Sequence, residues 1–169
     1  MYSIYADGVC IYNDVFSLDN MKVVNPKLTL EDSAAGSLEM TLPPTNAAYD
    51  TIVRMVTDIS VKKNGEEVWA GRALSESWNN RVLYCEGELA FFNDSVQPPA
   101  EYAGKSVRGY LDQLIAVHNG QVGENRRFAI GAVTVVDEAF PTYYTNYGKT
   151  LESLNALVEA YGGHRRVRK

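Results

Sequence analysis

The chain has 169 residues, 46% of them hydrophobic and 22% charged, which is typical of a soluble globular protein with one domain or two small ones. The formal net charge is −5, but four basic residues lie in the last five positions, so residues 1–164 hold 12 basic against 21 acidic residues, a balance of −9. This acidic body argues against binding nucleic acid through its phosphates, and the lack of a leader sequence or of an apolar stretch of about 18 residues predicts a protein made in a cytoplasm without membrane insertion.

The first 95 residues are predicted to be rich in β-strands. Asp7-Gly8, Asn64-Gly65 and Asn79-Asn80 each separate two strand-like runs, which is the pattern of a tight hairpin. Residues 25–32 and 36–44 alternate apolar and polar side chains. The apolar members, which we expect to face the core, are Leu28, Leu30, Leu38, Met40 and Leu42. Together the hairpins predict a small antiparallel barrel or sandwich.

Other residues of this region are expected to cap or fill that β-structure. Residues 45–55 are predicted to form one or two helical turns, with Thr45 or Asn46 as the cap. Two tryptophans and two cysteines are expected to be buried, the cysteines as free thiols because they show no C-x-x-C spacing. These four residues are Trp69, Trp78, Cys10 and Cys85.

A change of character follows at Pro98-Pro99 and Gly104, and it marks a predicted boundary between residues 1–95 and 96–169. The expected fold class is therefore α+β and β-rich, with a small antiparallel β-barrel-like module followed by a smaller α+β domain that has two helices.

The first predicted helix spans residues 107–118, with Ser106 as its N-cap and Asn119-Gly120 as a left-handed C-cap. His118 lies about three helical turns after Val107, so it continues the apolar stripe of this helix. The stripe also holds Tyr110, Leu111, Leu114 and Ile115.

A β-rich run is predicted over residues 128–138, followed by a second helix over residues 151–161 that Thr150 caps and Gly162-Gly163 end. The last residues, 164–169, are expected to begin a strand, as if the chain stopped within an element. Eleven tyrosines, several of them in residues 142–147, favour an interface with other subunits.

Candidate chemical sites are few. We assign no catalytic, cofactor-binding or metal-ligating residue and expect no cofactor, because the histidines and cysteines are too far apart in sequence for a ligand set and no nucleotide-binding or hydrolase motif is present. Glu86 and Glu88 are paired carboxylates on one strand, although a solvated strand face explains them better. Arg126-Arg127 forms either an anion site or a solvated turn. The basic residues after position 164 form either a nucleic-acid arm or an interrupted strand.

Five segments, residues 25–52, 68–77, 83–99, 114–135 and 150–163, carry a resemblance that covers nearly the whole chain. Their most specific parts are AGSLEMTLPP at residues 35–44, Gly71-Arg72, the CEG-L-FND pattern of residues 85–94, and His118-Asn119. In this order they resemble the N-terminal region of the prophage tail endopeptidase family, the tail-tip or baseplate-hub proteins of bacteriophages and related contractile particles.

The resemblance implies a homotrimeric hub in which barrel-like units form a ring around the tail channel. Residues 1–95 match the barrel and residues 96–169 match the start of an outer α+β insertion. Strands that return after the insertion complete such barrels, so a missing closing strand or an exposed edge is expected. The implied partners are a distal tail or tail tube protein and a tape-measure protein, in a virion assembled in the host cytoplasm. DNA would pass through the acidic lumen without specific binding.

The resemblance favours a structural protein rather than an enzyme, and any hydrolase activity is expected in a region beyond these 169 residues. Two alternatives stay open. A peptidase that acts on cell-wall peptides would use Cys85 and His118, the one nucleophile and base pair that the composition permits. A glycan-binding module would use the barrel and its tyrosines.

Overall fold

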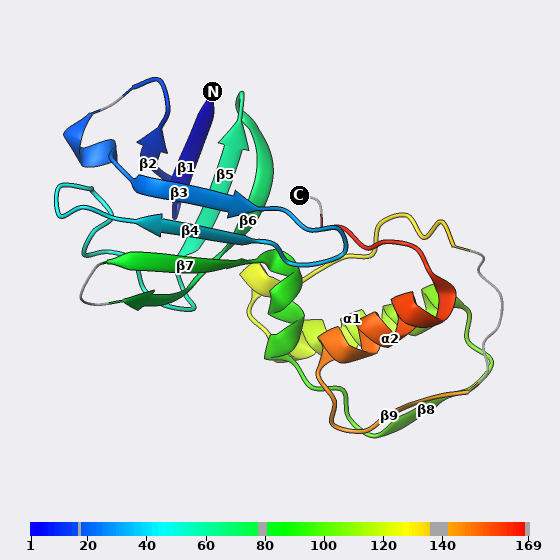
Figure 1. Cartoon of the computed structure of the whole chain (residues 1–169). Helices are drawn as coiled ribbons and strands as arrows, with labels where there is room; N and C mark the ends of the chain where they lie inside the picture. Colours follow the sequence, from blue (N-terminus) through cyan, green and yellow to red (C-terminus); the bar gives the residue numbers. More distant parts are fainter. Residues whose placement is uncertain (17, 78–80, 136–141, 168–169) are drawn as a thin grey trace. The chain divides into compact units, whose positions relative to one another are not determined.

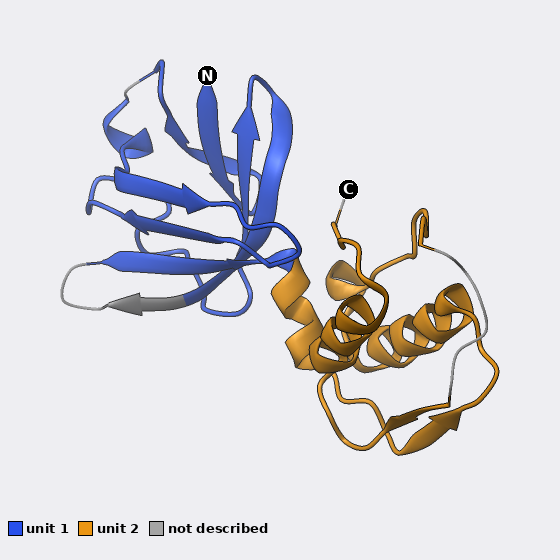
Figure 2. Cartoon of the chain, turned by 45° about the vertical axis from the view of Figure 1, so that its right-hand side comes forward, with its two compact units in different colours: residues 1–88 blue, residues 89–169 orange. Residues whose placement is uncertain are grey.

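The structure is a computed structural model of the chain that describes residues 1–16, 18–77, 81–135 and 142–167 (Figure 1). The chain divides into two compact units, Met1–Glu88 and Leu89–Lys169 (Figure 2). This division comes earlier than the predicted boundary at residues 95 and 96. The 3₁₀ helix η2 (Glu88–Asp94) explains the difference, because the rings of Phe91 and Phe92 pack against Phe128 of the second unit.

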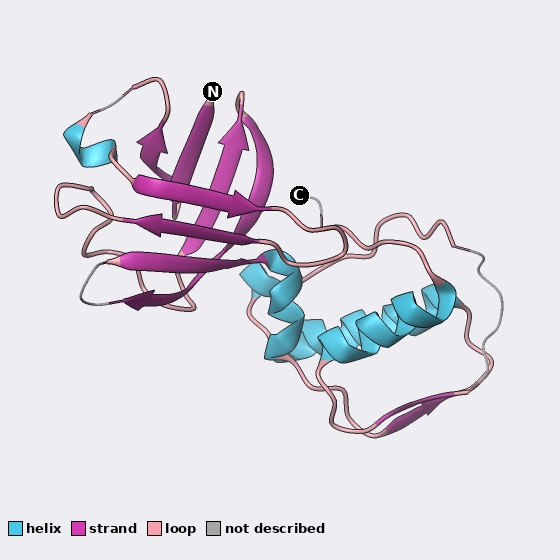
Figure 3. Cartoon of the chain, in the orientation of Figure 1, coloured by secondary structure: helices cyan, strands magenta, loops and turns pink. Residues whose placement is uncertain are grey.

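Unit 1 is a single seven-stranded antiparallel sheet that curls into a half-barrel (Figure 3). The order of strands across the sheet is β2-β1-β5-β6-β7-β4-β3. Its strands are β1 (Tyr2–Ala6), β2 (Val9–Asn13), β3 (Val24–Thr29), β4 (Ser37–Thr41), β5 (Asp58–Lys63), β6 (Glu66–Ser77) and β7 (Val82–Gly87), with a 3₁₀ turn η1 (Asp19–Met21) between β2 and β3. The predicted β-rich α+β class with a barrel-like module is confirmed.

Two of the predicted hairpin turns are confirmed by their backbone angles. Asp7 and Gly8 have φ values of 46° and 80°, and Asn64 and Gly65 have values of 54° and 87°. Positive φ at both central residues gives the turn a twist that matches the strands it joins, and Asp, Asn and Gly tolerate it best. The third predicted turn, Asn79-Asn80, lies outside the described residues, as does Trp78.

The alternating segments place their apolar side chains as predicted, with one exception. Leu38, Met40 and Leu42 are buried in the barrel core, and Leu28 is half-buried against it. Leu30 was predicted to be buried, but its side chain is 62% exposed. The reason is that β3 ends at Thr29, so the alternation does not continue to residue 30.

The helix predicted over residues 45–55 is wrong, because this segment forms a series of turns. The Asn46 side-chain amide donates to two distant carbonyls, and the amide N–H of Ala47 donates to the carbonyl of Asn20. The backbone bonds inside the segment are turn bonds between residues three apart, and the tertiary bonds of Asn46 and Ala47 hold the segment in these turns. Helical propensity is a weak signal that such contacts override.

Unit 2 contains the two predicted helices. Its elements after η2 are β8 (Ala100–Tyr102), α1 (Val107–Gln121), a 3₁₀ turn η3 (Glu124–Arg126), β9 (Tyr143–Thr145) and α2 (Thr150–Tyr161), and β8 pairs with β9. Ser106 caps α1 as predicted, since its hydroxyl accepts the amide N–H of Gly109 at 3.2 Å. Gly162, at φ 71°, ends α2 as predicted.

The other predicted caps are wrong. Helix α1 continues through Asn119 and Gly120 to Gln121, and Val122 ends it with extended backbone. Asn119 remains in the helix, and its side chain bonds to the backbone of Phe128: it donates to the carbonyl and accepts the amide N–H of that residue. Lys149, not Thr150, is the N-cap of α2.

Two predicted strands are also absent from the described residues. Residues 128–135 and 164–167 form neither helix nor strand. In the first segment, side chains bond the backbone in place of a neighbouring strand: Asn119 holds Phe128, and Arg108 donates to the carbonyl of Gly131. Apolar β-branched residues in this run therefore produced a strand signal without a pairing partner.

Candidate assembly surfaces

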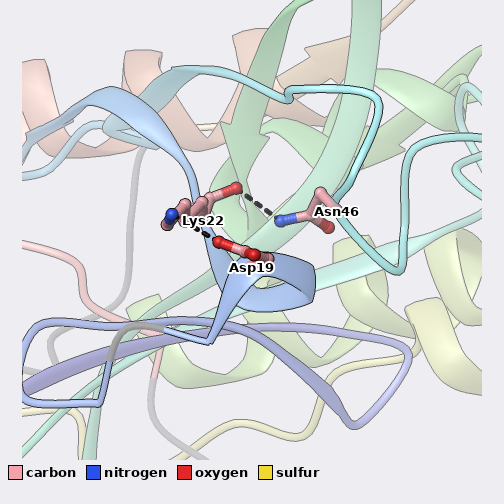
Figure 4. A network of polar contacts seen from close by, with 3 residues as sticks. All are labelled: Asp19, Lys22 and Asn46. Carbon is pink, nitrogen blue, oxygen red and sulfur yellow. Dashed lines mark hydrogen bonds and ion pairs between the residues drawn. The ribbon is translucent and has the colours of Figure 1, made fainter.

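One buried side chain, that of Asn46, bonds to both edges of the curled sheet, and Figure 4 shows its hydrogen bond to the carbonyl of Lys22. The Nδ2 atom of Asn46 donates to the carbonyl of Ile11 on edge strand β2, at 2.9 Å, and to the carbonyl of Lys22 just before edge strand β3, at 2.7 Å. Its Oδ1 atom accepts the amide N–H of Ala48. Both amide hydrogens are thus used. The side chain of Asn46, and no ladder of strand hydrogen bonds, bridges the seam of the half-barrel, which is the opening between edge strands β2 and β3.

Strand addition at the edges is restricted. Within the described residues, β2 pairs only with β1 and β3 pairs only with β4, which agrees with the expected exposed edge. However, β3 holds Pro26, which has no amide donor, and exposed Lys27, with an irregular register between Val24 and Lys27. These are the features by which natural proteins resist edge-to-edge pairing. Assembly through the loops of unit 1 is better supported than assembly through β3.

Large apolar side chains are exposed on the loops that the Asn46 amide holds together. The β2–β3 connection presents Phe16 at 65% exposure, between similarly exposed Val15 and Leu18. The β4–β5 connection exposes Val53, Met55 and Val56. Several large apolar residues exposed in neighbouring positions mark interaction surfaces in soluble proteins. The sequence signal was available, because Val15, Phe16 and Leu18 sit between two aspartates without strand alternation.

Trp69 anchors the core of unit 1, as predicted, and glycines make room for its indole. Gly71 and Gly87 are opposite one another in the β6–β7 ladder, and a Cβ atom on Gly87 would lie 2.9 Å from the indole nitrogen. That nitrogen donates to the carbonyl of Ala35 at 3.2 Å. The same Cβ atom would lie 1.7 Å from that carbonyl oxygen, so only glycine fits at position 87.

Glu86 does not lie on a simply solvated strand face. Its Oε1 atom is 2.8 Å from Nε and 2.6 Å from Nη2 of Arg72, the residue opposite it in the β6–β7 ladder. The guanidinium group is buried and the carboxylate is mostly so. Such a pair is stabilised by its own geometry and leaves Glu86 poorly suited to acid–base chemistry with Glu88.

The proposed Cys85 nucleophile is buried in the core of unit 1. Burial raises the pKa of its thiol to about 12, so the reactive thiolate is scarce at neutral pH. Cys10 is only half-buried, contrary to prediction, and its Sγ atom contacts the carbonyl oxygen of Tyr12.

The proposed base, His118, belongs to unit 2 and is fully buried there, continuing the stripe of α1 as predicted. Its Nδ1 atom is 2.6 Å from the Ser95 hydroxyl, and its Nε2 atom is 3.0 Å from the carbonyl oxygen of Arg126. Burial lowers the pKa of the imidazole below its usual 6.5. Both ring nitrogens are engaged inside the unit, and this arrangement does not favour the hydrolase hypothesis.

The remaining candidates separate by burial. The Arg126 side chain is buried over the Phe91 ring, at 4.3 Å from its centroid, whereas Arg127 is exposed. Tyr144 and Tyr147 are largely exposed, in keeping with an interface.

Across the described ranges, no set of three or more His, Cys, Asp or Glu residues is arranged to hold a metal ion. Nor does this part of the chain include a helix with the length and apolar character needed to cross a bilayer.

The fold of the chain is similar to that of solved structures, whereas its sequence matches no family model. No protein-family model matches the sequence, and none of the curated proteins matches it, so membership of the prophage tail endopeptidase family stays a prediction. Among solved structures, the chain is similar to the 43 kDa tail protein of prophage MuSo2 from Shewanella oneidensis, with a TM-score of 0.55 and 13% sequence identity. The match covers 94% of this chain but only 47% of that protein. At this identity the likeness shows the fold alone.

Proposed function

We propose that this chain is a structural component of a bacteriophage tail, in which the barrel unit joins other copies in a trimeric ring at the tail tip or baseplate hub. The observation that carries the proposal is the fold likeness to a prophage tail protein over nearly the whole chain. The chain spans less than half of that protein, so the ring, its position in the tail and its partners belong to the proposal.

Two features of unit 1 support assembly. Its β2–β3 and β4–β5 connections expose large apolar side chains, and one buried amide fixes these connections to each other. A preorganised apolar surface loses little conformational entropy on association. The acidic balance of residues 1–164 suits a channel wall that DNA passes without binding.

The proposed partners are other copies of the chain, a distal tail or tail tube protein on one side and a tape-measure protein within the channel. The proposed location is the virion, after assembly in the host cytoplasm. We assign the chain no enzymatic activity: the buried Cys85 thiol and the engaged His118 ring give a peptidase no support, and no specific contact favours a glycan site.

The direct test is the solution mass by light scattering across a concentration range, with electron micrographs of the same peak. The proposal expects a species of three times the 18.7 kDa chain mass and rings with a central hole. A mass of one chain at every concentration, also in the presence of a tail tube protein, would contradict the trimeric ring.

A further inference from the structure

Unit 2 contains a buried chain of hydrogen bonds that runs through its centre. Four polar side chains form it, and each is at most 1% exposed: Ser95, Gln97, His118 and Thr150. The Ser95 hydroxyl lies 2.6 Å from His118 Nδ1 and 2.6 Å from the Thr150 hydroxyl, and Gln97 Nε2 donates to the Thr150 hydroxyl at 2.7 Å. Buried polar groups are stable only when their bonds are satisfied, so the position of each proton matters.

The hydrogen-bond partners of His118 determine the tautomer of its imidazole. His118 Nε2 faces a carbonyl oxygen, that of Arg126, so this nitrogen must carry the hydrogen. In a neutral ring Nδ1 is then the acceptor, and the Ser95 hydroxyl donates to it. Because the only hydrogen of Ser95 is spent on the ring, the Thr150 hydroxyl must donate to Ser95.

Gln97, at the other end of this series of hydrogen bonds, requires the same direction of donation. The Gln97 amide nitrogen donates both to Thr150 and to the carbonyl of Leu114, at 3.1 Å. Turning the amide over would place its oxygen against the Leu114 carbonyl oxygen, which is unfavourable. Its own Oε1 is buried without a hydrogen-bond partner. The amide therefore acts only as a donor toward the network.

A proton added to Nδ1 cannot be accommodated in this arrangement. The ring nitrogen would become a donor facing the Ser95 hydrogen, so Ser95 would have to reverse and donate to Thr150. Thr150 would then accept from both the Ser95 hydroxyl and the Gln97 amide nitrogen, and its own hydrogen could no longer point at Ser95. The reversal therefore leaves the buried Thr150 hydroxyl hydrogen without the acceptor that it has in the neutral network, and a buried unsatisfied donor costs about 1–3 kcal/mol.

The network joins both helices of unit 2 to the segment between η2 and β8. Ser95 and Gln97 lie between η2 and β8, His118 lies on α1, and Thr150 is the first residue of α2. Parallel backbone bonds depend on the same arrangement: the amide N–H of Thr150 donates to the carbonyl of Ser95, and that of Gln97 donates to the carbonyl of Gly148. Breaking the network would therefore free the start of α2 and the η3 turn.

The surroundings of the ring oppose its charged form. The rings of Phe92 and Phe128 pack against the imidazole, with centroids 4.7 Å and 5.6 Å away. Burial is the largest influence and lowers the pKa of His118, while the hydrogen bond to Arg126 and the charge of Asp94 act against it. The guanidinium of Arg126 lies over Phe91, and α2 contributes the neutral Thr150 hydroxyl.

We propose that unit 2 is an acid-sensitive element, in which uptake of one proton by His118 breaks the buried network and opens the unit in mildly acidic solution. This inference does not depend on a role in a phage tail. It assigns a conformational response to a residue that has no place in the assembly surface.

The direction of the pH response follows from the difference in proton binding between the folded and the unfolded state. The folded pKa of His118 is lowered from 6.5, so the unfolded state takes up a proton at a higher pH than the folded state. The network's contribution to stability is complete above about pH 6.5 and is lost progressively as the pH falls toward the folded pKa. Each unit of difference between the two pKa values corresponds to about a tenfold change in the folded-to-open ratio.

The test is hydrogen exchange of the full chain between pH 7.5 and 5, with each rate divided by its intrinsic rate. Amides of residues 95–97, 118–128 and 147–154 should lose protection by about tenfold per unit of pKa difference, while β5 and β6 of unit 1 keep theirs. His118→Gln keeps a donor toward the Arg126 carbonyl but cannot titrate, and should remove the pH dependence. His164→Gln is the matched control and should leave it unchanged.

Asp94→Asn provides a second variant that leaves the network in place. Its carboxylate favours the charged ring, so removing it should move the loss of protection to lower pH. This result stands even where His118→Gln does not fold. The proposal is overturned if the protection of unit 2 follows that of unit 1 across the whole range, or if His164→Gln removes the effect.

Discussion

At the scale of single residues, the most constrained positions are the glycines around Trp69. Gly71 and Gly87 face each other in the ladder, and each would place a Cβ atom against backbone oxygen: that of Glu86, at 2.0 Å, and that of Ala35, at 1.7 Å. Backbone cannot move aside as a flexible side chain can. These glycines are therefore required by the close approach of strands and loop, and their φ angles impose no such need.

Gly87→Ala is expected to destabilise unit 1 by at least about 1–3 kcal/mol, the usual range for overpacking a core. The measurement is urea unfolding followed by tryptophan fluorescence, since both tryptophans lie within residues 1–88. Gly120→Ala is the control: a Cβ there meets nothing within 4 Å, and alanine favours α1 by about 1 kcal/mol. Equal midpoints for Gly87→Ala and the unaltered chain would refute the steric argument.

Thiol labelling should distinguish the two cysteines. Cys85 is buried with a pKa of about 12, whereas Cys10 is half-buried. We expect Cys10 to react first with a thiol reagent in the folded chain at pH 8, and Cys85 to react only after unfolding. Mass spectrometry of digested samples over time measures both rates, with Cys10→Ser to identify the slow site. Fast labelling of Cys85 would revive it as a candidate nucleophile.

At the scale of elements, the local turn signals were sufficient to predict the hairpins. Asp7-Gly8 and Asn64-Gly65 adopt a backbone conformation that their own residues favour, so no distant contact was needed to predict them. Segments 45–55 and 128–135 were predicted wrongly for one shared reason. In each, an asparagine side chain, of Asn46 or Asn119, bonds to distant backbone, and sequence patterns do not reveal such bonds.

The residues considered for chemistry also differ in whether local sequence or distant contacts determine their surroundings. Burial of His118 followed from helical spacing. Its partner Ser95 lies 23 residues away along the chain, and Thr150, which bonds to Ser95, lies 32 residues away, beyond any spacing rule. The Arg72–Glu86 pair required the β6–β7 register, which depends on a turn whose structure is not described. The exposure of Phe16, in contrast, had a local signal, because Val15, Phe16 and Leu18 sit between two aspartates without strand alternation.

Asn46→Ala tests the seam of the half-barrel. It removes three hydrogen bonds and leaves the carbonyls of Ile11 and Lys22 without that partner, so we expect a loss of about 2–3 kcal/mol in the free energy of unfolding of unit 1. Asn20→Ala is the matched control, because the Asn20 side chain is exposed and its contribution is a backbone carbonyl. A loss of the same size in both variants would count against the seam.

At the scale of the whole molecule, the fold and the proposed assembly rest on different observations. The fold likeness covers both units, whereas the assembly surface is argued from the loops of unit 1. A variant that changes one loop residue without touching the core therefore tests the assembly surface separately from the fold.

Phe16→Asp should shift the proposed trimer toward single chains by at least about tenfold in dissociation constant, the effect of losing one anchor of about 1.4 kcal/mol. Light scattering measures the change. Tyr147→Asp is the matched control, since Tyr147 is also an aromatic side chain, 72% exposed, but lies in unit 2. Loss of the trimer in the control alone would transfer the interface to the tyrosines of unit 2.

The order of the two units along the chain has a consequence for synthesis. Every described strand of unit 1 precedes Leu89, as do Ile11, Lys22 and Asn46, which meet at its seam. Within the described residues, no segment of unit 2 returns to complete the sheet. The half-barrel can therefore fold on the ribosome while unit 2 is still being translated. Its apolar loops are then already held in place when they first meet another newly made copy.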